Sequence, residues 1–470
     1  MKQFDRHQHG IAARLTCRWS RRSLLTALGT VILASGVIAC QAEIAPAVPT
    51  AALARLTPLP SPGRVPPKAV SSPSAVSLAT AVPTSVPPAM PDPLLSPVPS
   101  PSPTIPFDAN PEHLQPNGPP HDPGPLTWAH PGSYWGDRFN KSEIVSFSSK
   151  QPLITTYYFY WHDLTDPTRQ QRIKISWTES PPDPAHYSFL NVRTHLQQFS
   201  DMQAAGIDFV LPVYWGEPGH PGRNFNPTPG HFWSTEGIPP MIEAFDQLTA
   251  ARKPFKMGMF YDTTILANAD LTTENGKAYF YVNVRDFYSR IPPRHWAVID
   301  DKPIVWLYDT QWVSKFDQAT FDDLSERFAH DFAGLRPYVV REWQWYQSKG
   351  VTPSQIIHTD NLYGWGAAPS GFNTDPRFGV AEIGPGFNNT GFCHAGAAQN
   401  CFDVNRQNGA YYAQQWQEAL RAGHKLVAIE TWNEFSEGSG IAESVQYGRL
   451  YIDLTRKYAD AFHAGRTSAG

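Results

Sequence analysis

Two glutamates lie three residues apart near the end of this 470-residue chain, in the segment ETWNEFSEGSG at 430–440. Carboxyl groups at this spacing, Glu434 and Glu437, face the same side of a helical or tight turn. Glycosidic cleavage needs such a pair, because one group protonates the leaving oxygen while the other assists at the sugar ring. Burial beside Trp432 and Phe435, together with mutual repulsion, would hold one of them protonated near neutral pH. The segment therefore predicts a general acid and its partner.

A structural interpretation competes with this one. Glu434 could cap the following helix or tie down the glycine-rich loop, with Glu437 left in solvent. For a bare Glu-x-x-Glu that interpretation would be preferred, so the surroundings of the motif must decide.

Short apolar runs alternate with amphipathic stretches from residue 153 to the end, which is the pattern of repeated βα units. The predicted strands are Leu153–Tyr160, Phe209–Tyr214, Lys256–Tyr261, Pro303–Tyr308, Tyr338–Val340, Gln355–Thr359, Gly379–Ile383 and Lys425–Glu430. The predicted helices are Val192–Ala205, Pro240–Ala251, Ala278–Arg290, Phe321–Ala333, Glu342–Lys349, Gly409–Ala422 and Val445–Tyr458. Eight strands in this alternation predict an α/β fold, a (β/α)8 TIM-type barrel.

Aromatic, acidic and amide residues follow several of these strands. They are Tyr160, Trp161, His162, Tyr214, Trp215, Glu217, Tyr261, Asp262, Tyr308, Asp309, Asp360, Trp432 and Asn433. In such a barrel the carboxyl ends of the strands build the active site. Rings stack on the C–H faces of sugars while acids and amides pair with hydroxyl groups. Their repetition predicts a carbohydrate cleft, with all of these side chains except Glu217 assigned as substrate-binding residues.

The stretch from Trp432 to Gly438, followed by Ile441-Ala442-Glu443 and by the sequence YGRLYI at 447–452, resembles the final barrel segment of the glycoside hydrolase family 99-like superfamily. The segments at 204–215 and 383–390 are similar to that group as well. The superfamily contains endo-α-mannosidases and related domains found with bacterial polysaccharide-synthesis proteins. The resemblance covers about residues 154–458, and its final segment is the specific part.

This resemblance implies a retaining reaction in which the sugar's own 2-hydroxyl participates. Glu434 would draw the proton from that hydroxyl, and Glu437 would act as general acid and then base. The family usually has Trp-His between the two glutamates, where this chain has Phe435-Ser436. The missing His leaves the sugar and the linkage open.

The same residues allow two other interpretations. Asn433-Glu434 looks like the acid/base pair of many retaining β-glycosidases, but there the pair follows the fourth strand and the nucleophile the seventh. Here it follows the eighth strand, which argues against that class. The second alternative is a non-catalytic glycan-binding surface protein that uses the same aromatic cleft.

Composition divides the chain into three parts. Residues 41–125 hold about half of the 46 prolines and few aromatics, so residues 40–125 are expected to be a disordered, extended stalk. Residues 126–470 form the folded domain and carry most of the 15 Trp and 19 Tyr. In an exported protein, Cys393 and Cys401, eight residues apart, predict a disulfide rather than a metal site.

The first 39 residues read as an export signal. A basic region with Arg21 and Arg22 precedes an apolar run from Leu24 to Ala39, too short to span a bilayer comfortably. The run ends in Val-Ile-Ala-Cys40, which resembles a lipoprotein cleavage box, so Cys40 is predicted to carry a lipid anchor such as a palmitate-bearing diacylglycerol. The arginine pair also resembles a twin-arginine signal, and both export routes remain open.

Charge and motif content indicate which partners the protein has. The net charge of −4, without Lys/Arg blocks after the signal, excludes nucleic acid as a partner. The sequence shows no metal-ligand cluster, phosphate loop or cofactor signature, so hydrolysis without a cofactor is expected. We expect an exported, membrane-anchored monomer that meets a polysaccharide outside the cytoplasm.

Overall fold

The computed structural model describes residues 117, 120, 122, 139–166, 177–216, 233–394 and 401–469. The barrel strands are β1 (Leu153–Tyr158), β2 (Phe209–Tyr214), β4 (Met259–Tyr261), β7 (Lys302–Leu307), β9 (Tyr338–Glu342), β10 (Asn361–Tyr363), β11 (Val380–Ile383) and β14 (Leu426–Ile429). Within the described residues these eight strands form one parallel path in the order β10-β9-β7-β4-β2-β1-β14-β11. The predicted (β/α)8 barrel is confirmed.

The barrel closes between β10 and β11 without a regular ladder. The Gly379 N–H donates to Leu362 O at 3.1 Å and bridges the two strands. A Cβ atom at Gly379 would lie 2.1 Å from Asn361 Oδ1, so only glycine allows this approach.

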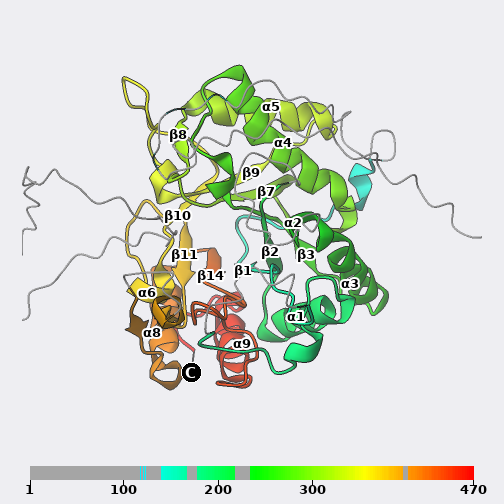
Figure 1. Ribbon diagram of the computed structural model, residues 1–470, viewed down its shortest axis with the longest axis vertical. Coiled ribbons are helices and arrows are strands. Elements are labelled where there is room, and N and C mark those ends of the chain that lie inside the picture. The colour runs from blue at the N-terminus through cyan, green and yellow to red at the C-terminus, as the bar shows by residue number, and fades with distance from the viewer. Residues whose placement is uncertain are drawn as a thin grey trace, which may run out of the picture.

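Helices surround the strands, as Figure 1 shows, with α4 and α5 beside β7 and β9, and α1 and α3 beside β2. Their bounds are α1 (Val192–Ala205), α2 (Trp233–Glu236), α3 (Ile238–Ala250), α4 (Glu274–Arg290), α5 (Gln318–Asp331), α6 (Ala367–Ser370), α7 (Thr390–His394), α8 (Ala410–Ala422) and α9 (Leu450–His463). Short strands complete the chain: β3 (Lys256–Met257), β5 (Ala269–Asp270), β6 (Val298–Ile299), β8 (Val313–Lys315), β12 (Phe387–Asn388) and β13 (Asp403–Val404).

Helix α1 shows how the sequence sets these elements. The Asn191 side chain accepts from the Arg193 N–H and caps the first turn, and Gly206, at φ +86°, ends the helix in the left-handed conformation. Phe199 and Met202 are fully buried on the face toward the barrel. Both boundaries match the predicted helix.

Successive side chains along β1 point alternately into the barrel and toward the surrounding helices. The Tyr157 ring lies 4.8 Å from Phe260 and 5.9 Å from Trp306, inside the barrel. The next residue, Tyr158, points outward and its hydroxyl is 2.9 Å from His195 Nδ1 on α1.

Two predicted elements are wrong. Residues 355–359 are not the sixth strand, which is β10. They run outside β9, where Ile357 O accepts from Arg341 Nη2 at 2.6 Å and Ile356 is exposed. The predicted helix Glu342–Lys349 is the end of β9 followed by a short 3-10 helix, Trp343–Trp345.

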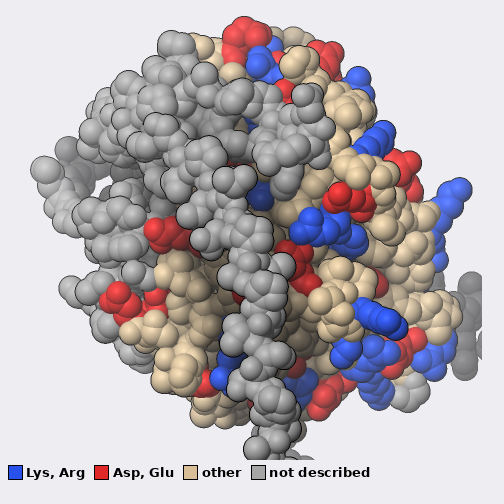
Figure 2. Space-filling model, turned by 90° about the vertical axis from the view of Figure 1, so that its right-hand side faces the viewer, with Lys and Arg blue, Asp and Glu red and all other residues tan. Residues whose placement is uncertain are grey.

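The surface carries mixed charge. On the face in Figure 2, the described Lys and Arg side chains lie among Asp and Glu, and neither sign forms a continuous patch. Ion pairs such as Arg294–Asp246 and Arg327–Asp323 belong to this pattern. No helix in the described part of the chain has the length and apolar character to cross a membrane.

Candidate active site

The two glutamates lie in a tight turn after β14. The Phe435 N–H donates to Asn433 O at 2.9 Å, and the Glu437 N–H donates to Glu434 O at 3.2 Å. Glu434 is buried and Glu437 is partly buried. The turn therefore carries both carboxyl groups at the carboxyl end of the barrel.

Asn433 ties this turn to the end of β1. Its Nδ2 donates to Phe159 O at 2.8 Å and to Tyr187 Oη at 2.7 Å, while its Oδ1 accepts from the Phe159 N–H at 2.8 Å. Both ends of the amide are thus engaged within the protein. Asn433 positions the turn and does not present its amide to a substrate.

Glu434 sits among hydroxyl groups. Its N–H donates to Thr431 Oγ1 at 3.1 Å, and Ser436 Oγ donates to its Oε1. Burial raises the pKa of Tyr187, and the charge of Glu434 raises it further, so that hydroxyl stays protonated beside the carboxylate. The Ser436 side chain occupies the sequence position at which the resembling family has His.

Glu437 is partly buried and is held through its backbone. Its carbonyl oxygen accepts from the Asn388 N–H on β12 at 2.7 Å. Burial raises the pKa of Tyr308, and the charges of Asp309, Asp262, Glu437 and Glu430 raise it further. The Glu437 carboxyl group therefore lies close enough to Tyr308, the residue after β7, to interact with it electrostatically.

Two further buried acids, Glu430 and Glu342, lie directly after β14 and at the end of β9. Burial raises the pKa of Glu430 to about 7, and Glu437 adds to the rise, against hydrogen bonds from the N–H groups of Gly366 (3.0 Å) and Ala368 (3.2 Å). Burial likewise raises the pKa of Glu342 to about 8, with Asp309 adding to the rise. Burial, which removes these carboxyl groups from water, is the main cause of both shifts.

Asp262 and Asp309 complete the acidic group. Trp215 Nε1 donates to Asp262 Oδ2. Burial raises the pKa of Asp309 to about 6, and Asp262 adds to the rise, while Gln311 donates to both carboxyl oxygens at 3.0 and 2.8 Å. Both predicted acids lie where the sequence placed them, after β4 and β7.

Aromatic rings gather at the ends of β1 and β2. Trp161 lies 5.6 Å from Trp215 and 5.7 Å from Trp233 between ring centroids. His162 lies 4.6 Å from Trp177, which stacks on Phe435 at 6.1 Å. The rings at the ends of β1 and β2 thus continue to the turn that carries the glutamates. On the other side, Tyr308 lies 5.0 Å from Trp365.

Four predicted substrate-binding residues direct their polar atoms toward the helical layer. Tyr214 Oη donates to Asp286 and Tyr261 Oη accepts from Asn283, both on α4, while Tyr160 Oη donates to Ser234 O. Trp432 Nε1 donates to Gln198 Oε1 on α1 at 2.5 Å. Their place near a strand end is as predicted. Strand pleating turns Tyr214 and Tyr261 toward the helical layer, and the loops after β1 and β14 do the same for Tyr160 and Trp432.

Asp360 lies at the opposite end of the barrel. Its carboxylate pairs with Lys302 at the start of β7 (2.6 Å) and accepts from the Val339 N–H near the start of β9 (2.9 Å). The prediction is wrong for this residue because Asp360 precedes the sixth strand instead of following it. Glu217 lies outside the described residues.

Sequence reasoning missed several residues of this site. Glu342 was hidden by the wrong helix assignment, and Glu430 was read only as the end of a strand. Trp177 and Tyr187 lie in the long connection from β1 to α1, where no periodicity marks them. The sequence signal for Glu342 would have been its position as an acidic residue at the end of a strand, β9.

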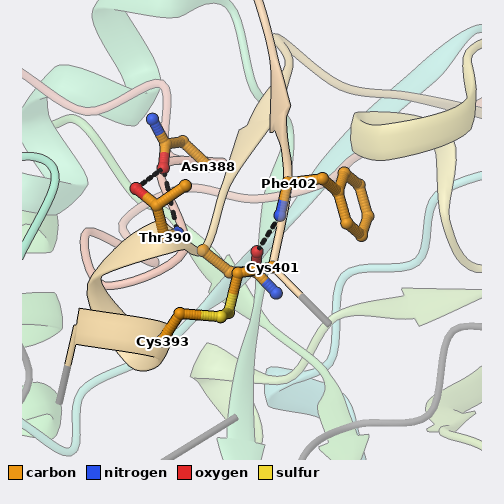
Figure 3. Close-up of a disulfide and its surroundings, with 6 residues drawn as sticks. Asn388, Thr390, Cys393, Cys401 and Phe402 are labelled. Carbon is orange, nitrogen blue, oxygen red and sulfur yellow. Dashed lines mark hydrogen bonds between the residues drawn. A yellow bond between two sulfur atoms is a disulfide. The ribbon is translucent and has the colours of Figure 1, made fainter. Parts of the chain in front are cut away.

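The predicted disulfide is confirmed. Cys393 and Cys401 are bonded, with Cα atoms 6.0 Å apart, beside the hairpin of β12 and β13 (Figure 3). Asn388 Oδ1 accepts from the Thr390 N–H at 3.1 Å and from its hydroxyl at 2.6 Å, which fixes the start of α7. Across the described part of the chain, no group of three or more His, Cys, Asp or Glu is arranged to hold a metal ion.

Comparisons with known proteins agree with the resemblance found in the sequence. A family model described as "Domain of unknown function (DUF5010)" matches residues 184–468. The glycoprotein endo-alpha-1,2-mannosidase-like protein of Mus musculus is 22% identical over 369 residues, which cover 65% of this chain and 73% of that protein. The predicted resemblance to the endo-α-mannosidase group is thus confirmed.

Two solved structures are similar in fold. The GH99 endo-alpha-mannosidase from Bacteroides thetaiotaomicron has a TM-score of 0.44 at 14% identity, covering 67% of this chain and 98% of that one. A protein described as "Glycoside hydrolase-like protein" has a TM-score of 0.47 at 16% identity, covering 70% of this chain and 99% of that one.

Proposed function

Because the chain belongs to the family described as a domain of unknown function (DUF5010), whose description assigns no reaction, we propose an activity from its own site. The chain is a retaining glycoside hydrolase that cleaves an α-linked, mannan-like polysaccharide. One observation carries this proposal: Glu434 and Glu437 share a fixed turn at the carboxyl end of the barrel, between aromatic rings and buried acids.

The reaction uses both glutamates in each of its two steps. Glu437 gives its proton to the glycosidic oxygen, and that bond breaks, while Glu434 accepts the proton of the 2-hydroxyl, whose oxygen bonds to C1. Glu437, now ionised, then takes a proton from water as the water oxygen attacks C1. The C1–O2 bond opens, and O2 recovers its proton from Glu434. Two inversions at C1 retain its configuration.

The surroundings support these roles. The buried carboxyl groups of Glu430 and Glu342 have raised pKa values, which shows that the barrel mouth disfavours negative charge. The charge of Glu437 contributes to the raised pKa of Glu430, so these two carboxyl groups lie close enough to interact. Glu434 has the Ser436 hydroxyl as a donor, which stabilises it as a carboxylate and suits an acceptor of the 2-hydroxyl proton.

Incubation with α-mannans and other α-glycans tests the proposal. Wild-type protein should release new reducing ends, and Glu437→Gln and Glu434→Gln should each lower the rate by about 10²–10⁴-fold. Glu443→Gln is the matched control, since Glu443 lies on the same segment but pairs with Arg449. Binding without release by the wild type and by both variants would favour the glycan-binding alternative.

We also propose that the protein is exported and held at a membrane by lipid on Cys40. The basic region, the apolar run to Ala39 and the small residues before Cys40 support this location. A polymer too large to enter the cell would then meet the barrel outside the cytoplasm. These residues lie outside the described part of the chain.

A further inference from the structure

A short glycine-rich stretch directly follows Glu437. Gly438 has φ +53°, and a Cβ atom there would lie 2.9 Å from Thr178 Oγ1 and 3.1 Å from Asn388 Cβ. The backbone therefore turns through a space that neighbouring segments already fill. The carbonyl groups of Gly438 and Gly440 need donors in this dry environment.

Arg406 supplies both donors. Its Nη2 donates to Gly438 O at 2.6 Å and its Nη1 donates to Gly440 O at 2.9 Å. The side chain is only 5% exposed. One rigid guanidinium thus fixes two carbonyl groups on either side of Ser439, a geometry that its planar fork provides.

A buried carboxylate and two rings balance the charge of Arg406. Glu179, 3% exposed, forms an ion pair with Nη2. The rings of Tyr447 and Tyr451 lie 4.7 and 4.8 Å from the guanidinium carbon. A buried charge without such partners would be strongly unfavourable, so the pair is a matched unit.

Glu179 and its neighbour Thr178 also hold the start of the turn, at Phe435. The Glu179 N–H donates to Phe435 O at 3.3 Å, and the neighbouring Thr178 hydroxyl lies 3.3 Å from that oxygen. Hydrogen bonds thus hold the backbone at Phe435, before Glu437, and at Gly438 and Gly440, after it. Segments from three different loops meet at this point.

We infer that Arg406, neutralised by Glu179, is the positioning residue for the proposed general acid Glu437. This inference rests on the proposed function. Arg406 does not touch the substrate; it sets where the Glu437 carboxyl group lies by fixing the backbone that follows. Sub-ångström placement matters for proton transfer, because a general acid must lie within hydrogen-bond reach of the leaving oxygen.

Arg406→Lys in the full chain is the sharpest test. Lysine keeps the charge for Glu179 but replaces the two-pronged donor by a single ammonium, so it cannot hold both carbonyl groups in the same geometry. Arg449→Lys is the matched control. Arg449 also anchors this part of the chain, through Asp201 (2.7 Å) and Glu443 (3.2 Å), but does not contact the turn.

Two substrates separate positioning of the acid from general damage. Hydrolysis of α-mannan needs protonation of a poor leaving group, the sugar oxygen. In α-mannobiosyl fluoride the leaving group is a fluoride ion, which departs with little help from a general acid. Arg406→Lys should lower kcat on mannan by about tenfold or more, with KM within about twofold, and change the rate on the fluoride by less than about threefold. Arg449→Lys should leave both rates near wild type.

Hydrogen–deuterium exchange gives a readout that needs no activity. Arg406→Lys should raise exchange in peptides covering 434–440 while the barrel strands stay protected and the thermal unfolding curve stays cooperative. Equal loss on both substrates, or unchanged exchange at 434–440, would overturn the inference. If wild type cleaves neither substrate, the proposed function fails, and exchange alone decides whether Arg406 fixes the turn.

Discussion

The buried acids at the mouth of the barrel make stability depend on pH. The pKa of Glu342 is raised by burial from its ordinary 4.5 to about 8. Between these values the folded state keeps a proton that the unfolded state has released. The free energy of unfolding therefore falls as pH rises through this window and is constant on either side of it with respect to this group.

Glu342→Gln should remove that part of the pH dependence. The variant keeps an oxygen that can accept from the Gln344 N–H, which lies 2.7 Å from the carboxylate. Relative to wild type, it should gain roughly 1–4 kcal/mol between pH 4.5 and pH 8, at about 1.4 kcal/mol per unit of pKa shift. Urea unfolding at both pH values measures this.

The exposed Glu326 on α5 provides the control for that experiment. Glu326→Gln should change the free energy of unfolding by a similar small amount at both pH values. An equal difference between Glu342→Gln and wild type at pH 4.5 and 8 would show that Glu342 does not hold a proton in the folded state.

Single residues also show the limit of sequence reading at this site. The motif around Glu434 was recognisable because its residue types are rare together, and Asp262 and Asp309 were found at their strand ends. The direction of a side chain was not recognisable. Tyr261 and Asp262 are neighbours in sequence, yet Tyr261 packs on Phe280 of α4 (5.5 Å) while Asp262 accepts from Trp215.

At the scale of elements, long periodic segments were predictable and short ones were not. Helix α1 and strand β2 have the predicted bounds because each buries a regular apolar pattern. Strand β10 has three residues, Asn361–Tyr363, too few for a pattern to appear. The apolar pair Ile356-Ile357 nearby gave a stronger but false strand signal, since only Ile357 is buried.

The hairpin of β12 and β13 links the disulfide to the acid-bearing turn. Asn388 pairs with Asp403 in this hairpin, and its N–H holds the Glu437 carbonyl at 2.7 Å. The bond between Cys393 and Cys401 closes the chain between the two strands. Restraint of the hairpin therefore bears directly on the position of Glu437.

Removing the disulfide should weaken both stability and activity. The double variant Cys393→Ser/Cys401→Ser loses a loop closure worth about 2–3 kcal/mol in the chain-entropy account. We expect a lower melting temperature and a reduced kcat on mannan, with KM changed less. Reductant should reproduce this loss in wild type and have no effect on the double variant; an undiminished kcat in the variant would contradict the link.

At the scale of the whole molecule, we propose that the proline-rich residues before the barrel act as a spacer. Near the end of this segment, Asn117 and Asp122 already contact the barrel, at Gln311 and Asn275. Residues 40–125 are proline-rich, and a fully extended chain of that length would reach on the order of 250 Å at ~3.1 Å per residue. No sequence pattern in them predicts a core, so their composition alone supports a spacer. The barrel, with its site at one end, would then act on polymers well away from the membrane.

Cys40→Ser tests this arrangement. The full chain, expressed in a bacterium that processes lipoproteins, should partition into the detergent phase because each buried CH₂ of the acyl chains contributes about 0.8 kcal/mol. The variant should no longer incorporate labelled palmitate, while its activity on mannan stays the same, since the barrel is unaltered. Cys17→Ser, in the same signal region, is the control and should still be lipidated. A Cys40→Ser protein that still incorporates palmitate would show that another residue carries the lipid.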